Sequence, residues 1–186
     1  MSTSETSDTD RRDFLYITTG AVGAVGAAFT AWPFIDQMNP DASVLALSSI
    51  EVDIASLAEG QSITVTWRGN PVIIRHRTAK EIEEAKNVSM DELIDPQARN
   101  ANVADSADAT DINRVVDGKE KILVMLGVCT HLGCVPIGDA GEYDGWFCPC
   151  HGSHYDTSAR IRKGPAPENL PVPEYQYLSD TKIRIG

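Results

Sequence analysis

Basic side chains and cysteines are both scarce in this sequence. Its 186 residues include 16 Lys and Arg against 27 Asp and Glu, which gives a formal net charge of -11 at pH 7. Because a protein that binds nucleic acid needs a basic surface to face the phosphates, we expect no nucleic-acid partner. The four cysteines lie in two short segments instead of being spread along the chain. Such a distribution is not typical of a domain held together by a framework of disulfides.

Charged residues are absent from positions 14–35, a run of 22 residues. A helix of that length spans about 33 Å, which is enough to cross a hydrocarbon core of roughly 30 Å. We therefore predict a transmembrane anchor over residues 13–36, with a lipid bilayer as its partner. The alternative is a signal peptide cleaved near the small residues 26–28, although the run is longer than the signal core of about 7–15 residues that such peptides have.

Lysine and arginine are absent between Arg12 and Arg68. Arg11 and Arg12 directly precede the apolar run, so the positive-inside rule places the tail at 1–12 in the cytoplasm and the rest of the chain across the membrane. The segment Arg-Arg-Asp-Phe-Leu at 11–15 is similar to the twin-arginine export signal, which serves proteins that cross the membrane already folded. We expect a protein of the bacterial inner membrane with its C-terminal domain in the periplasm.

A short segment separates the predicted anchor from the rest of the chain. Asn39-Pro40-Asp41 disfavours a helix, and small residues follow it. We predict a flexible tether over residues 37–48. The sequence leaves open whether this tether is a working hinge or an inert linker.

The remaining residues, 49–186, are predicted to form one domain that is mainly β. Alternating and β-branched segments bounded by turn residues, such as Gly69-Asn70, are typical of strands. The run 121–126 is apolar throughout and short, which favours a buried strand. We expect strands at residues 63–67, 71–74, 121–126, 143–147, 159–162 and 181–185.

Three polar features of this domain are interpreted as surface. Thr78 and Glu81 form a capping box at the start of a short charged helix over residues 78–86, whose glutamates, Glu81 among them, we expect to be exposed. His76 lies between two arginines, and we expect it on a solvated strand edge. Residues 100–117 are polar and lack a clear period, so we expect a surface insertion there.

All four cysteines and three of the four histidines lie within residues 129–154. Cys129-x-His131 and Cys148-x-x-His151 each offer one thiolate and one imidazole. Two such pairs serve either a tetrahedral zinc ion or a two-iron, two-sulfide cluster, in which both cysteines bind one iron and both histidines bind the other. Zinc sites more often pair cysteines roughly two to four residues apart and histidines roughly three to five apart, which Cys-x-His does not match. The sequence therefore predicts a metal centre and favours the cluster over zinc.

These two loops resemble those of the Rieske iron–sulfur proteins. The segments Cys-Thr-His-Leu-Gly-Cys-Val-Pro (129–136) and Cys-Pro-Cys-His-Gly-Ser-His-Tyr-Asp (148–156) are similar to the loops of the Rieske subunits of respiratory cytochrome bc complexes, the ubiquinol–cytochrome c reductases. Gly-Pro-Ala-Pro at 164–167 resembles the proline loop that covers the cluster in that family. The likeness is strong over residues 121–186 and weaker before them. It implies a Rieske-type antiparallel β domain whose cluster-binding part spans about residues 127–168.

The resemblance implies one Rieske-type 2Fe-2S cluster and a role for each ligand. By position, Cys129 and Cys148 are expected to bind the buried iron, and His131 and His151 the exposed iron. Imidazole ligands lower the negative charge of a cluster relative to four thiolates, and this raises its reduction potential. We expect the reduced cluster to carry a proton on His151, so that the site couples one electron to one proton.

Further residues take their expected roles from the same resemblance. Cys134 and Cys150 are expected to form a disulfide that joins the two loops, which fits an exported domain. Rieske ferredoxins and oxygenases generally lack this second cysteine pair. Ser153 and Tyr155 match the two family residues that donate hydrogen bonds to a bridging sulfide and to the sulfur of Cys129, and such bonds raise the potential.

The function that the resemblance implies is electron transfer from ubiquinol to a membrane c-type cytochrome. His151 is expected to accept the hydrogen bond of ubiquinol at the quinol-oxidation site of cytochrome b, and Leu132 to dock into the cytochrome b surface. Gly164, Pro165 and Pro167 are expected to form the proline loop. The resemblance implies a dimeric complex in which this chain is one subunit of an enzyme that couples ubiquinol oxidation to proton translocation.

Two other functions remain open at this stage. The first is a Rieske subunit of another exported oxidoreductase of the arsenite oxidase type, because such a subunit can share the export signal and the disulfide. The second is a zinc-stabilised binding module without redox activity, since zinc also accepts a mixed set of thiolate and imidazole ligands.

Overall fold

Two units make up the chain in the computed structural model, Met1–Leu45 and Ala46–Gly186. The structure describes residues 11–41, 48–116 and 118–186. Most of the predicted tail at 1–12 and half of the predicted tether at 37–48 lie outside the described residues, as does Asp117 at the end of the predicted insertion.

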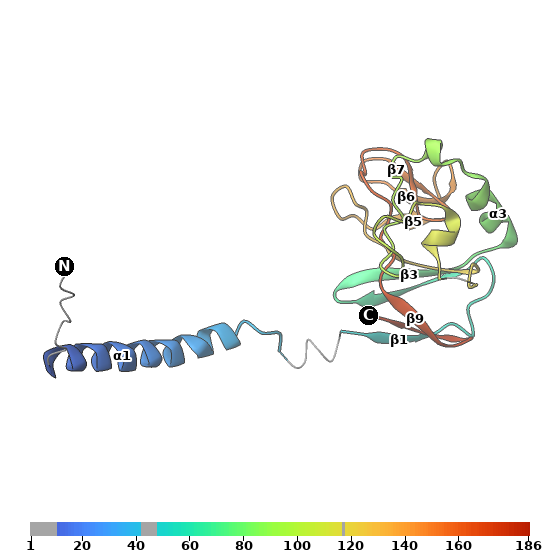
Figure 1. Ribbon diagram of the computed structural model, residues 1–186. Helices are drawn as coiled ribbons and strands as arrows, with labels where there is room; N and C mark the ends of the chain where they lie inside the picture. Colours follow the sequence, from blue (N-terminus) through green and yellow to red (C-terminus); the bar gives the residue numbers. More distant parts are fainter. Residues whose placement is uncertain (1–10, 42–47, 117) are drawn as a thin grey trace, which may run out of the picture. The chain divides into compact units, whose positions relative to one another are not determined.

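The first unit contains one long helix, α1, over Arg11–Asp36 (Figure 1). All of its described side chains are exposed, the apolar ones included. By length and composition the helix is able to cross a membrane. It coincides with the predicted anchor and ends before the Asn39-Pro40 segment, because a residue that precedes proline is disfavoured in helical conformation.

Three antiparallel sheets form the second unit. One sheet has the order β1 (Ile50–Asp53), β10 (Lys182–Ile185) and β9 (Tyr175–Ser179). Another has the order β2 (Ser62–Trp67), β3 (Asn70–His76) and β4 (Ile122–Leu126). The third has the order β5 (Ile137–Gly138), β6 (Asp144–Cys148), β7 (Ser153–Asp156) and β8 (Ile161–Lys163). Within this unit, Figure 1 shows β5 to β7 at one end, β1 and β9 at the other, and β3 between them.

The sheet of β2, β3 and β4 lies between two hydrophobic cores. Successive side chains of a strand point to opposite faces of its sheet. Ile73 of β3 and Met125 of β4 therefore join the core that contains Cys129, whereas Ile74 and Val124 join the core built with β9 and β10. Because both faces of β4 are buried, its sequence is apolar throughout instead of alternating.

All six predicted strands overlap observed ones, and four observed strands, β1, β5, β7 and β9, were not predicted. The hairpin turn between β2 and β3 lies one residue earlier than expected, at Arg68 and Gly69, which both have positive φ, 49° and 79°. This geometry is the one that matches the twist of the two flanking strands. Strand β8 begins at Ile161 instead of at Ala159, because Ala159 has a φ of 60° and lies in the turn after β7.

Helix α3 (Ala79–Asn87) has the predicted capping box, which is confirmed. The expectation that its glutamates are exposed is wrong for Glu81, which is only 9% exposed. In the capping box the Glu81 carboxylate turns back to accept the Thr78 N–H at 2.6 Å. There it also meets the Arg75 guanidinium at 2.6 Å, so a buried ion pair joins α3 to β3.

His76 is not on a solvated strand edge, so this prediction is wrong. It ends β3, which is the middle strand of its sheet, and its Nδ1 lies 2.8 Å from the carbonyl oxygen of Leu57. Its two neighbours Arg75 and Arg77 are also buried, at 7% and 1% exposed. Charge in this strand indicates buried ion pairs and not solvent.

The predicted surface insertion at 100–117 is confirmed for 101–108, whose residues are exposed or half-buried, and is wrong for the second half, where Ala109, Asp111, Arg114 and Val115 are buried. The segment contains a short 3-10 helix, η2 (Asp111–Arg114), and another, η1 (Met90–Glu92), precedes it. Arg114 is 0% exposed and its guanidinium donates to the carbonyl oxygens of Ser158 at 3.0 Å and Leu170 at 2.6 Å. Burial lowers the pKa of Arg114 to about 10. The polar side chains of this segment bind backbone groups inside the fold, which is why polarity alone gave the wrong expectation.

Candidate metal centre

Two tight turns present the predicted ligands. The first begins at Cys129 after β4, and the Gly133 N–H donates to the Cys129 carbonyl at 2.9 Å. The second joins β6 to β7, and the Gly152 N–H donates to the Cys148 carbonyl at 3.0 Å. Gly133 and Gly152 have positive φ values of 82° and 77°, which glycine adopts without strain. The two loops therefore have the same local construction.

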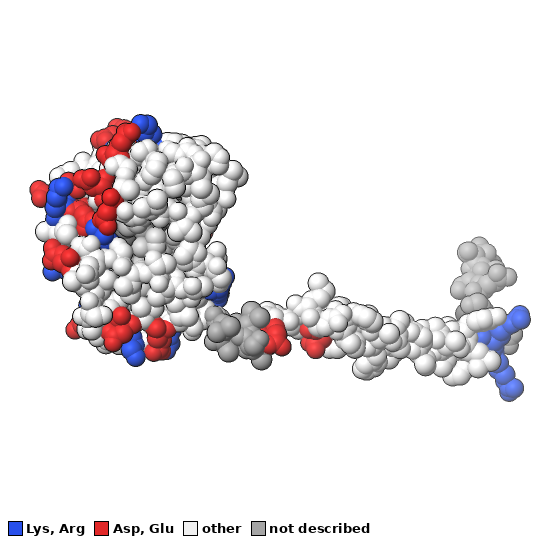
Figure 2. Space-filling model, turned by 180° about the vertical axis from the view of Figure 1, so that it is seen from behind, with Lys and Arg blue, Asp and Glu red and all other residues white. Residues whose placement is uncertain are grey.

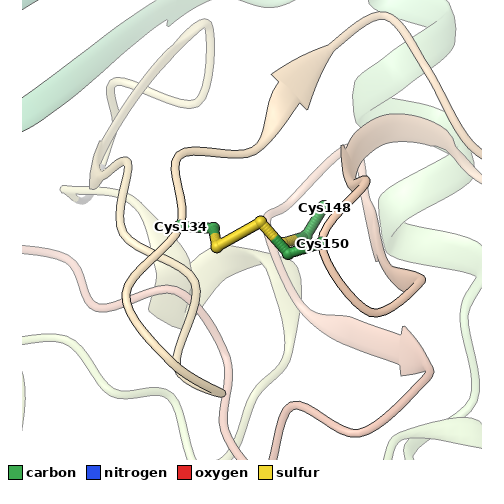
Figure 3. Close-up of side chains that lie close together, drawn as sticks. All are labelled: Cys134, Cys148 and Cys150. Carbon is green, nitrogen blue, oxygen red and sulfur yellow. A yellow bond between two sulfur atoms is a disulfide. The ribbon is translucent and has the colours of Figure 1, made fainter.

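The structure contains the predicted disulfide between Cys134 and Cys150, and it joins the first turn to the second (Figure 3). The sulfur of Cys148 lies beside it, and the three sulfur atoms are within 4.8 Å of one another. A cysteine in a disulfide has no thiolate to offer a metal ion, so this group of three is not itself a metal site. Cys129 and Cys148 are the two free cysteines, and both are buried.

The two free thiols lie in contact at the inner side of the loops. Burial opposes ionisation of Cys129, but hydrogen bonds from the Tyr155 hydroxyl, the His131 backbone and other neighbours outweigh it, so the pKa of Cys129 is lowered from its usual value. The Cys129 Sγ–Tyr155 Oη distance is 3.2 Å. Burial first, and then the contact with Cys129, raise the pKa of Cys148. A thiolate supported by several hydrogen bonds is suited to bind a metal.

The two predicted histidine ligands lie at the outer side. His151 is exposed and His131 is half-buried. Their ring centroids are 4.7 Å apart and the rings are nearly perpendicular, at 87°. Within residues 11–41, 48–116 and 118–186, no three of the four predicted ligands have ligand atoms that all lie within 4.8 Å of one another. A tetrahedral zinc ion needs four atoms around one point, whereas two irons need an inner and an outer pair, and the observed arrangement fits the second case.

Ser153 and Tyr155 lie in β7, next to the thiols, and both are buried, at 1% and 0% exposed. The Ser153 hydroxyl is one of the neighbours that lower the pKa of Cys129. Burial raises the pKa of Tyr155, so this side chain stays a hydroxyl donor. Both residues are therefore placed to donate hydrogen bonds at the sulfur of the inner pair.

The loop at 164–167 is hydrogen-bonded to both ligand loops. The Ala166 N–H donates to the Ser153 hydroxyl at 3.2 Å, and the Thr130 hydroxyl donates to the Glu168 carbonyl at 2.7 Å. Gly164 has a φ of 105°, and a Cβ at this position would lie 2.5 Å from the Gly152 carbonyl oxygen. The sequence did not single out Thr130, because a hydroxyl between two ligands has no spacing of its own to mark it.

Leu132, which was predicted to dock into cytochrome b, and its neighbours give the outer side of the ligand loops an uncharged surface. Leu132 is 71% exposed, and Val135 and Ile137 are more than half exposed. No Asp, Glu, Lys or Arg occurs in residues 127–138 or 145–153. Figure 2 shows charged side chains at the top, the left side and the bottom of the second unit, and a broad uncharged area at its upper right. Pro165 and Pro167 are exposed as well, whereas Ala166 is buried between them.

His154, the third histidine of this stretch, is not part of the site. Its Nδ1 accepts the Glu142 N–H at 3.1 Å, and its ring packs against Phe147 at a centroid distance of 4.8 Å. It supports the connection between β5 and β6 and has a structural role.

A β domain in which two buried thiols lie beneath one exposed and one half-buried imidazole, on two neighbouring loops, is typical of the Rieske class of iron–sulfur proteins. Residues 52–176 match the Rieske [2Fe-2S] domain family. The predicted fold class and the predicted 2Fe-2S cofactor are thereby confirmed, and the zinc-stabilised module is excluded.

Further matches are to one particular kind of Rieske subunit. Residues 1–41 match the family described as "Ubiquitinol-cytochrome C reductase Fe-S subunit TAT signal". The ubiquinol-cytochrome c reductase iron-sulfur subunit of Bradyrhizobium diazoefficiens is 56% identical over 188 residues, covering 100% of both chains. That of Blastochloris viridis is 54% identical over 187 residues, covering 100% of this chain and 98% of the relative. The chain belongs to the family of ubiquinol–cytochrome c reductase iron–sulfur subunits.

A solved structure supports the fold. A chain of "Hyperthermophilic respiratory Complex III" is similar with a TM-score of 0.52 at 23% identity, covering 90% of this chain and 98% of that one. The resemblance of the two loops to this family therefore extends over most of the chain. The matches favour the reductase subunits over the arsenite oxidase alternative.

Proposed function

We propose that this chain takes electrons from ubiquinol at cytochrome b and delivers them to a membrane c-type cytochrome within a dimeric reductase. The observation that supports this most is the arrangement of the predicted ligands, two buried thiols beneath one exposed and one half-buried imidazole. An electron carrier that reacts with a quinol needs its acceptor near the surface, and the exposed histidine provides that position. Catalysis belongs to the assembled enzyme, since the chain alone has one redox site.

The proposed ligands are Cys129 and Cys148 for the inner iron, and His131 and His151 for the outer iron. The cluster supplies a one-electron acceptor whose potential is raised by its two imidazole ligands. The chain's own part is to hold the thiolates in a hydrogen-bonded, water-poor environment and to leave the His151 ring open to solvent. His151 is the group that would accept the hydrogen bond of ubiquinol and take up its proton at the ring nitrogen that is not bound to iron.

Leu132 is the proposed contact with cytochrome b. It is 71% exposed and belongs to the same uncharged loop as His131. Exposed apolar side chains around a site are typical of a docking surface, because they lose water when a partner covers them. The uncharged loops also bring no buried unpaired charge into that contact.

The proposed position of the chain is the bacterial inner membrane. The family match over residues 1–41 and the apolar helix α1 both suit a membrane anchor. The distribution of arginines, two before the helix and none after it until Arg68, supports a cytoplasmic N-terminus and a periplasmic domain. The segment at 37–48 would then join the anchor to the cluster domain and let that domain reach both electron partners.

The substitution Leu132→Asp tests the proposal, because it adds a charge at the proposed docking contact without touching a ligand. We expect quinol–cytochrome c reductase turnover of the purified complex to fall at least tenfold, while the low-temperature electron spin resonance spectrum of the reduced protein keeps the low average g of a mixed-ligand cluster. Leu178→Asp is the matched control, since Leu178 is also exposed but lies in β9, outside the sheet of β5 to β8. Equal turnover in the two variants would count against the docking role, and a wild-type protein without the cluster signal would count against the ligand assignment.

A further inference from the structure

A buried asparagine closes the base of the proline loop. Asn169 follows the loop directly and is 0% exposed. Its side-chain oxygen accepts the Ile161 N–H at 2.8 Å, so the residue bridges the two ends of the segment 162–168. This bond joins the end of the loop to β8.

The same asparagine ties the loop to the segment 95–99, which is distant in the sequence. Its Nδ2 donates to the carbonyl oxygens of Asp95 at 3.1 Å and Gln97 at 2.8 Å, and its backbone N–H donates to the Asp95 carboxylate at 3.0 Å. Asp95 is 3% exposed, and it also accepts from Arg99 Nε at 2.9 Å. Arg99 in turn reaches the carboxylate of Glu168 at 3.2 Å. A buried polar network with every member bonded holds one arrangement strongly.

The far side of the loop touches the ligand loops. Ala166 donates to the Ser153 hydroxyl, and Glu168 exchanges hydrogen bonds with the Thr130 hydroxyl, which its N–H reaches at 3.3 Å. Ser153 pairs across β6 and β7 with Cys148, which is a proposed ligand. A shift of the loop base therefore reaches Ser153, the cross-strand neighbour of a proposed ligand.

We propose that Asn169 and Asp95 are positioning residues for the cluster site. They hold the proline loop against Thr130 and Ser153, and so keep the Ser153 hydroxyl in place beside the proposed thiolate ligands. The inference rests on the proposed function through the assignment of Cys129 as a ligand. It gives a role to the segment 95–99, which carries no recognisable motif.

The test is Asn169→Ala in the full chain, loaded with its cluster and assembled in the complex. We expect hydrogen exchange of the amides in 164–168 to become at least tenfold faster. A tenfold change corresponds to about 1.4 kcal/mol, which is no more than the contribution of one or two buried hydrogen bonds. The midpoint potential should fall, in the same direction as in Ser153→Ala, because hydrogen bonds to the sulfur stabilise the reduced cluster. Neither readout requires quinol or a cytochrome.

Asn100→Ala is the matched control. Asn100 is also buried, at 7% exposed, but its side chain bonds to Asn113 and Asn102, away from the loop. Loop exchange and potential that stay at wild-type values in Asn169→Ala, or that change as much in Asn100→Ala, overturn the proposal. If Asn169→Ala does not retain the cluster, Asp95→Asn, which keeps the side-chain volume, decides by the same two readouts. A wild-type protein that lacks the cluster signal refutes the proposed function itself, whereas a normal wild-type signal with unchanged variants refutes this inference alone.

Discussion

The substitution Asp111→Asn removes one partner of a buried ion pair that joins three parts of the domain. Asp111 is 3% exposed and accepts from Arg77 Nη1 at 2.5 Å, from Arg77 Nη2 at 3.2 Å and from the Ser158 hydroxyl at 2.6 Å. Arg77 belongs to the segment just after β3, Asp111 to η2, and Ser158 to the turn between β7 and β8. The asparagine keeps the volume but leaves the Arg77 guanidinium, whose side chain is 0% exposed, without its counter-charge.

Breaking a buried ion pair by removing one partner costs about 3–5 kcal/mol, because the other charge stays buried without compensation. Arg77 keeps its two hydrogen bonds to the Glu120 carbonyl, at 3.0 and 2.6 Å, so we expect the lower end of this range, about 3 kcal/mol. With a urea dependence of roughly 1–3 kcal/mol per molar for a domain of this size, the unfolding midpoint should fall by about 1–3 M.

The assay is urea unfolding of the full chain in detergent, loaded with its cluster and followed by tryptophan fluorescence. Asp180→Asn is the control, since the Asp180 side chain is 95% exposed although it lies 2.9 Å from Lys119, and exposed pairs of this kind contribute little. The double variant Arg77→Met, Asp111→Leu should recover much of the loss, because it leaves no buried charge unpaired. A midpoint for Asp111→Asn within error of that for Asp180→Asn would refute the reasoning.

Three further outcomes are expected. Ser153→Ala and Tyr155→Phe should each lower the midpoint potential in a redox titration, and unchanged midpoints in both would contradict the proposed hydrogen bonds to the cluster sulfurs. Replacing Cys134 and Cys150 by serine opens a bridge across 16 residues and should destabilise the loops by about 3 kcal/mol, seen as faster loss of the cluster absorbance; an unchanged half-life contradicts this. The midpoint potential should fall as pH rises, because reduction is proposed to take up a proton at His151, and a potential that is independent of pH would exclude that proton.

Local spacing marks the candidate ligands, whereas the burial of the residues around them depends on distant contacts. Cys129, His131, Cys148 and His151 were assigned as ligands from spacing and resemblance, because the ligands of each pair lie within one short loop and local order brings them together. The pairing of Cys134 with Cys150 came from resemblance alone, and the structure contains it. No local pattern could have shown it, since the two loops meet only when β4, β6 and β7 are in place.

The errors have one cause in common. Glu81, His76 and the segment 100–117 were assigned to the surface because they are polar, yet Glu81, Asp111 and Arg114 are buried and His76 is half-buried beside a carbonyl. A buried charge is tolerated when a partner of opposite charge or a carbonyl oxygen is in reach. Those partners are distant in the sequence: Arg77 finds Asp111 34 positions later, and Arg114 finds the Leu170 carbonyl 56 positions later. Single-sequence patterns report only neighbours in the chain.

The sequence by itself determined the apolar helix, the acidic character and the family, and it indicated the candidate ligands, since composition and short spacings are local properties. Only the tertiary structure decided which side of the loops is buried, how the disulfide joins them, and how the proline loop is held by Asn169 and Asp95. The physical reason is that burial and hydrogen-bond satisfaction depend on contacts between residues far apart in the chain. The two loops specify what kind of centre this is, and the packing around them specifies its surroundings.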